Sequence, residues 1–207
     1  AASDRALAAA GILNDARGGT LELMLTPAKA EKSYDGVLSI AELRVKSAPA
    51  LATLLNAVSV VGLLEQLDGQ GLHFAKVAAR FRLTPARLTV IESSAVGASA
   101  GMSMDGYYDL ETRRLDMQGV LSPVYMLNAI GGALTTRAGE GLIGVNFTLR
   151  GPAENPAVAV NPLSALTPGF LREMFRRPSP QVEGAPPALS GQNARPDPPR
   201  SFEGPNR

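Results

Sequence analysis

The chain has 207 residues, of which 45% are hydrophobic, so it is long enough to bury one core. Its 20 basic and 19 acidic residues nearly cancel, and a net charge of +1 gives no electrostatic footprint for nucleic acid. The absence of cysteine excludes disulfides and thiolate metal sites, and it fits the cytosol and a bacterial envelope equally well. Because no signal-peptide pattern follows Ala1, we expect a fragment of a longer protein.

Alternating apolar residues predict the first strands of the chain. Residues 20–45 are typical of strand, turn and strand, with the turn at residues 33–36. The clearest alternation covers residues 73–83, where His73, Val77 and Phe81 share one face and Arg80 lies on the other. This segment therefore predicts a strand with one side exposed to water.

The remaining chain predicts four more strands and three helices. The strands, separated by glycine or turn residues, are expected at residues 87–92, 102–108, 114–121 and 142–150. The helices, each with proline near its first turn and apolar nearly all round, are expected at residues 49–67, 123–135 and 162–175. The fold class is therefore mainly β, an antiparallel sheet covered by two or three apolar helices.

The organisation predicts one folded domain, residues 1–177, and a tail. A strand, helix, Gly-x-Gly-Leu turn and strand pattern occurs twice, at about residues 36–83 and 112–150. Residues 178–207 are rich in proline and poor in apolar side chains, so this tail is expected to be disordered.

The sequence holds few groups for catalysis. The only histidine, His73, falls on the predicted apolar face and is expected to be a core or rim residue. Asp105, Asp109, Glu111 and Asp116 lack the spacing of a metal-binding loop and are expected to lie on a solvated face or in turns. We therefore predict no enzyme, no catalytic residue, no metal site and no cofactor.

Apolar residues are more abundant than the predicted strands need, so the excess surface must be covered. The helices can fold over the sheet and complete an ordinary closed core. Alternatively, part of the sheet stays open and holds acyl chains in place of side chains. Composition alone does not separate these two possibilities.

Several motifs, in order and spacing, resemble the C-terminal region of the bacterial AsmA-like envelope proteins. They comprise residues 36–40 (GVLSI), 48–51 (APAL), 69–72 (GQGL), 119–123 (GVLSP), 139–142 (GEGL), and 161–164 (NPLS) followed by 168–172 (PGFLR). The resemblance covers about residues 11–177, and the closing motif is the most specific. One departure is the polar stretch at residues 134–137, where related sequences continue with apolar residues.

The resemblance implies a periplasmic part of a protein anchored in the inner membrane of a Gram-negative bacterium. Such a protein forms a curved β-sheet whose hydrophobic groove carries phospholipid across the periplasm. This chain would be the end near the inner leaflet of the outer membrane, supporting lipid homeostasis there. The alternative is a non-catalytic scaffold that binds an outer-membrane or envelope assembly protein through its helices or tail.

Two sets of residues are the candidates for these functions. The expected lining of the lipid groove is Leu23, Val77, Phe81, Ile91, Ile143 and Phe147. The expected lid or membrane contact is Leu54, Leu55, Val58, Val61, Tyr125, Leu127, Phe170, Leu171 and Phe175.

Overall fold

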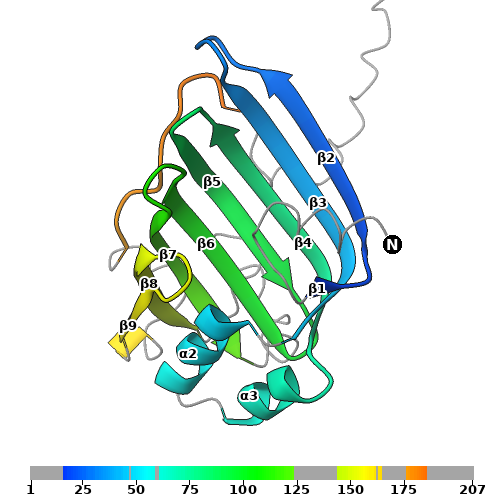
Figure 1. Cartoon of the computed structure of the whole chain (residues 1–207). Coiled ribbons are helices and arrows are strands. Elements are labelled where there is room, and N and C mark those ends of the chain that lie inside the picture. Colours follow the sequence, from blue (N-terminus) through cyan, green and yellow to red (C-terminus); the bar gives the residue numbers. More distant parts are fainter. Residues whose placement is uncertain are drawn as a thin grey trace, which may run out of the picture.

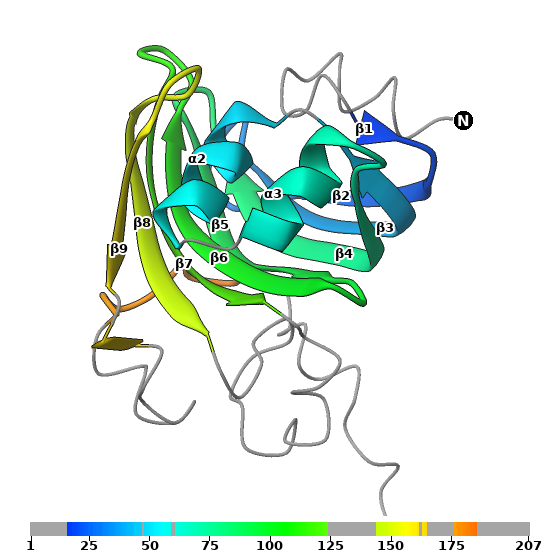
Figure 2. The same ribbon diagram turned by 90° about the horizontal axis from the view of Figure 1, so that it is seen from below.

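The computed structural model describes residues 16–46, 48–58, 61–123, 144–161, 163–164 and 176–185. In this part of the chain, nine strands form one antiparallel sheet in the order β1-β3-β4-β5-β6-β7-β8-β9, with β2 also paired to β3 (Figure 1). The strands are β1 (Ala16–Arg17), β2 (Thr20–Pro27), β3 (Tyr34–Val45), β4 (Leu72–Leu83), β5 (Arg87–Val96), β6 (Ala100–Asp109), β7 (Arg114–Pro123), β8 (Val145–Pro152) and β9 (Ala157–Asn161). The predicted mainly β class and curved antiparallel sheet are confirmed (Figure 2).

The strand register sorts the side chains of the sheet onto two faces, because successive residues of a strand point to opposite sides. Two cross-strand rows are Leu21-Ile40-Val77-Ala95-Met102-Leu121-Val145 and Leu23-Leu38-Ala79-Ser93-Met104-Gly119-Phe147-Val160. Two more are Leu25-Gly36-Phe81-Val90-Gly106-Met117-Leu149-Val158 and Pro27-Tyr34-Leu83-Leu88-Tyr108-Leu115-Gly151. These four rows contain no charged residue, and we call the surface they form the apolar face.

The charged residues of the same strands alternate with these rows and project from the opposite side, which we call the polar face. They include Glu22, Asp35, Lys76, Arg80, Arg82, Arg87, Glu92, Asp105, Asp109, Arg114, Asp116 and Arg150. The sheet is therefore divided completely by charge within the registered rows.

Two helices cover one end of the apolar face, on its concave side (Figure 2). They are α2 (Pro49–Ala57) and α3 (Val61–Asp68), and α2 begins with Pro49 in its first turn, where the missing N–H has no intrahelical partner to lose. Leu54, Leu55, Leu63 and Leu67 are buried against the strands in one core cluster. The predicted helix at residues 49–67 is therefore two helices, separated after Ala57.

Among the described side chains of these helices, the exposed ones are mostly polar, so the prediction that the helices are apolar nearly all round is wrong for this part. Thr53, Asn56, Glu65 and Asp68 are exposed, whereas the leucines of the same helices face the core. The helices thus have the one-sided pattern of ordinary surface helices.

The alternation of β3 and β4 is interrupted at Glu42, whose φ of 57° lies in the left-handed region. Leu43 and Phe74 consequently join Ile40 in the core cluster, although strict alternation would place them on the other face. His73 points away from that cluster, and its Nε2 lies 2.8 Å from a carboxylate oxygen of Glu42. The prediction that His73 belongs to the apolar face is therefore wrong.

Glycines allow large side chains to lie flat across neighbouring strands of the apolar face. Phe81 is paired with Gly36, where a Cβ would come within 2.2 Å of the phenyl ring. Phe147 covers Gly119 in the same way, with its ring 2.6 Å from the position of a Cβ. These pairs fill the face with aromatic area without lifting the rings away from the sheet.

Several boundaries differ from the predictions. The β2–β3 turn occupies the residues before Tyr34, because the Ala28 N–H donates to the Ser33 carbonyl at 2.9 Å. Strand β9 was not predicted, since residues 157–161 follow a proline and are short. The helix predicted at residues 123–135, most of the one at 162–175 and the middle of the second repeat (112–150) lie outside the described residues; Pro123 itself ends β7.

Residues 176–185, which we call the strap, run across the polar face from β7 to β4, shown in orange in Figure 1. Pro180 is buried, and the Glu183 carbonyl accepts a hydrogen bond from Arg82 at 3.0 Å. Residues 178–185 therefore do not fit the disorder expected of the tail, whose remainder lies outside the described residues.

Candidate functional site

The apolar face is unevenly covered. Near the helices its side chains are buried: Ile40 and Leu121 are each 2% exposed. At the other end, near the β2–β3 turn, Leu23 is 50% exposed and Leu25 is 45% exposed. The face therefore has a closed end under α2 and α3 and an open end, where apolar side chains remain accessible.

The predicted groove lining is divided between these two ends. Leu23 is exposed, and Val77 and Phe81 are partly buried on the same face, so all three are placed to contact an apolar ligand. Phe147 also lies on this face but is only 2% exposed. Phe147 therefore has almost no surface left for contact with a ligand.

Ile91 and Ile143 are the remaining two residues of the predicted lining. Ile91 is the extra residue of a β-bulge in β5, between Val90 and Glu92, and among the described residues it does not join the core cluster. It is buried, at 8% exposed, so it offers little surface to a ligand, and its assignment to the groove stays a prediction. Ile143 lies outside the described residues.

The structure describes four of the nine residues predicted to form the lid or membrane contact. Leu54 and Leu55 cover the closed end of the apolar face and are 2% and 0% exposed, so they have almost no surface left for membrane contact, and their role as a lid stays a prediction. Val58 is partly buried against the same cluster, and Val61 begins α3. The other predicted lid residues, Tyr125, Leu127, Phe170, Leu171 and Phe175, lie outside the described residues.

Sequence reasoning missed several accessible residues of the open end. Leu25, Leu38, Leu83, Leu88, Val90 and Leu115 lie in the same rows as the predicted lining. Extending the period-two pattern of β4 to its neighbours finds these residues once the pairing register is known. The register itself was not available from one sequence.

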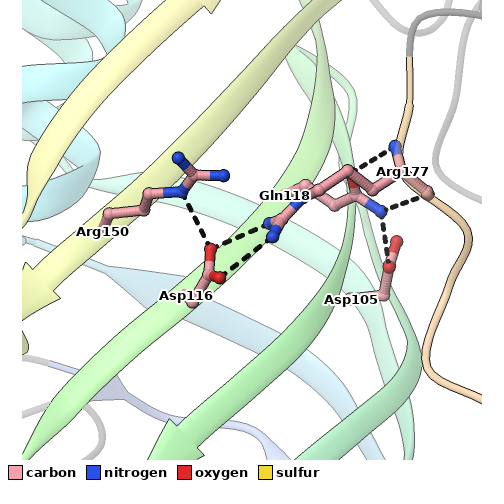
Figure 3. Close-up of polar contacts among 5 residues, drawn as sticks. All are labelled: Asp105, Asp116, Gln118, Arg150 and Arg177. Atoms are coloured by element: carbon pink, nitrogen blue, oxygen red, sulfur yellow. Dashed lines mark hydrogen bonds and ion pairs between the residues drawn. The ribbon is translucent and has the colours of Figure 1, made fainter.

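On the polar face, the side-chain amide of Gln118 forms hydrogen bonds with the main chain of the strap. The Gln118 amide donates to the Arg177 carbonyl at 2.7 Å and accepts from the Arg177 N–H at 3.0 Å (Figure 3). The side chain thus pairs with the strap as a neighbouring strand would, with one donor and one acceptor. The same amide also donates to Asp105 at 3.0 Å, which connects the strap to β6.

Three ion pairs surround this amide. Arg176 donates to Asp105, and both side chains are almost fully buried, at 2% and 0% exposed. Arg177 contacts both oxygens of Asp116, at 2.9 and 2.8 Å, and Arg150 adds a third donor at 3.1 Å. The prediction that Asp105 is a solvated residue is therefore wrong.

The ion pairs of this cluster shift the pKa values of Asp116 and Arg177. Hydrogen bonds from Arg177, followed by those from Arg150, lower the pKa of Asp116 against the opposing effect of desolvation. The hydrogen bond to Asp116 in turn raises the pKa of Arg177. Farther along the strap, Arg82 forms a two-point pair with Asp35, both contacts at 2.7 Å.

These features define the class of protein as an open, two-faced β-sheet module with an apolar concave face and a polar face bound to its own strap. Within the described part of the chain, the helices are too short and too polar to cross a bilayer. Comparison with protein-family models, with curated proteins and with solved structures gives no match. The resemblance to the AsmA-like proteins therefore stays a prediction from the sequence motifs.

Proposed function

We propose that this chain is the C-terminal end of a periplasm-spanning lipid-transfer protein of the AsmA-like kind. Its apolar face holds phospholipid acyl chains, and its working environment is the periplasm, close to the outer membrane. The observation that carries the proposal is the apolar face itself: four rows without a charged residue that are closed by helices at one end and accessible at the other.

The chemistry of such a face suits acyl chains. Each CH₂ removed from water contributes about 0.8 kcal/mol, so a half-covered chain is held by several kcal/mol without a specific polar contact. Exposed apolar surface of this kind marks an interaction site when it is continuous. Val77 packs against the buried core, and Phe81 lies farther along β4 on the same face, so an acyl chain would have a continuous apolar path from the open end.

Two neighbouring residues of β2 provide a matched test. Leu23 is on the apolar face and Met24 is on the polar face, and both are exposed, at 50% and 66%. Replacing either with aspartate adds one charge to the same edge strand at little cost to folding. We expect Leu23→Asp to reduce copurifying phospholipid strongly and Met24→Asp to leave it unchanged, measured by native mass spectrometry and lipid extraction.

A different result separates the proposal from its alternative. Two results would rule out lipid binding by this face. One is a wild-type protein that is folded by circular dichroism but carries no lipid. The other is an equal lipid content in the two variants. The second candidate is then a scaffold in envelope assembly. The observation that favours it is the burial of Leu54 and Leu55, because the helices close the end of the core by themselves.

A further inference from the structure

Three arginines surround a depression at the end of the sheet formed by the β6–β7 hairpin. The depression has a volume of about 520 Å³, and Arg87, Arg114 and Arg150 contribute to its lining together with Tyr107. Leu115 and Gly151 also line it, and these two residues belong to the outermost row of the apolar face. The depression therefore lies at the rim where the polar face meets the open end of the apolar face.

The two carboxylates in this lining already have donors. Asp109 accepts from the Thr112 N–H at 2.8 Å and from the Thr112 hydroxyl at 2.7 Å, and these bonds lower its pKa. Asp116 accepts from Arg177 and Arg150, as described above. The acid groups are thus engaged with the protein's own hydrogen-bond donors.

Two of the arginines form no ion pair with these carboxylates among the described residues, although both are cross-strand neighbours of Asp109 and the charge of Arg87 helps to lower the pKa of that carboxyl. The Arg87 guanidinium lies over the Tyr107 ring, 5.4 Å from its centroid, which leaves the N–H edge of the guanidinium accessible. Among the described residues, neither Arg87 nor Arg114 has a carboxylate within ion-pair distance, and both are exposed. Arg113 differs, because its guanidinium lies 3.6 Å from the Glu154 carboxylate.

We propose that this depression binds a phosphate group, with Arg87 and Arg114 as its principal donors and the Tyr107 face orienting Arg87. A planar guanidinium matches a phosphate through two parallel hydrogen bonds, and two such groups on one rim bind a single anion cooperatively. The position of Leu115 and Gly151 makes the phosphate of a phospholipid the natural ligand, since its acyl chains would extend onto the apolar face. This choice of a lipid over free phosphate rests on the proposed function.

The test compares two double variants of the full chain with equal loss of charge. Arg87→Gln/Arg114→Gln removes the two donors, and Lys76→Gln/Arg113→Gln removes two exposed charges that do not line the depression. Isothermal titration calorimetry measures binding of inorganic phosphate, glycerol phosphate and monomeric dihexanoylphosphatidylglycerol. We expect the first variant to weaken binding of all three by about tenfold and the second to change it little.

The three probes identify the source of the phosphate. Tighter binding of the short-chain lipid than of glycerol phosphate, lost in Leu88→Asp on the neighbouring part of the same apolar row, assigns the site to a phospholipid. Equal affinities for all three probes assign it to soluble phosphate. Absence of saturable binding, or equal effects of the two double variants, would overturn the site while leaving the acyl-chain proposal intact, because that proposal is tested by the Leu23→Asp and Met24→Asp pair.

Discussion

The two faces of this sheet are built from alternate residues of the same strands, yet they are stabilised differently. The apolar face gains from area removed from water, which depends little on what covers it. The polar face uses directed hydrogen bonds and ion pairs to one segment, such as the two-point contact between Gln118 and the main chain of Arg177. The first face is therefore suited to varied apolar partners, and the second to a single strap.

The polar face therefore binds one specific segment, whereas the apolar face can accept different apolar partners. The strap contacts strands β6 and β7 through Asp105 and Asp116 and reaches β4 through Arg82. The strap therefore links β4, β6 and β7 on the side of the sheet opposite the concave apolar face. The predictions below test this contrast, beginning with the largest effect.

Breaking the buried ion pair on the polar face is expected to cost most. Asp105→Asn removes the charge that faces Arg176, and breaking a buried pair typically costs about 3–5 kcal/mol because one charge remains uncompensated. Urea unfolding followed by circular dichroism measures this loss. The exposed Glu111→Gln is the control and should leave the midpoint unchanged.

A double variant shows how the cost arises. Asp105→Asn/Arg176→Met removes both charges, so it should be more stable than Asp105→Asn alone. A cost below about 1 kcal/mol for Asp105→Asn would mean that the strap detaches and Arg176 becomes hydrated, and the pair would then contribute little to the fold.

On the apolar face, the closed and open ends should respond differently to loss of the same side chain. Leu55→Ala opens a cavity under α2 and should cost about 2–5 kcal/mol, because Leu55 is fully buried. Leu23→Ala, at the open end, should cost much less. Equal costs in urea unfolding would show that the open end is as tightly packed as the closed end.

Overpacking beneath Phe81 tests the close contact between neighbouring strands of the apolar face. Gly36→Ala places a methyl group 2.2 Å from the present ring position, so the ring must move, at an expected cost of about 1–3 kcal/mol. Adding Phe81→Leu should recover part of the loss, since the smaller side chain leaves room for the methyl group. An additive double variant would contradict the contact.

The sequence predicted the division between the two faces only locally. The alternation of β4 correctly placed Arg80 and Phe81 on different faces of the sheet, because period-two patterns are a property of the strand itself. The same pattern misplaced His73, since the left-handed conformation at Glu42 shifts the alternation and no local signal marks a non-glycine residue there.

The strap was beyond sequence reasoning for a different reason. Its partners lie far away in the chain: Gln118 is 59 residues from Arg177, and Asp105 is 71 residues from Arg176. A proline-rich segment with few apolar residues satisfies the composition of a disordered tail. Only the arrangement of the strands brings the carboxylates and the amide into a row that the two arginines can reach.

The smallest expected effect is a loosening of the strap in acid. Because Arg177 and Arg150 lower the pKa of Asp116, the folded state holds its carboxylate charged to a lower pH than the unfolded state does. The stabilisation is therefore complete above the unfolded pKa of about 4 and is lost as the pH falls through the depressed folded pKa.

Substituting Asp116 isolates this contribution from the general effect of acid. Asp116→Asn should lower the urea midpoint slightly at neutral pH and flatten its decline below pH of about 4, relative to the wild type. The effect stays small because the Asp116 side chain is 44% exposed, and solvent screens the pair. The Gln118 contact with Arg177 carries no titrating group, so the strap should remain attached in acid; complete release would show that charge, rather than main-chain recognition, holds it to the polar face.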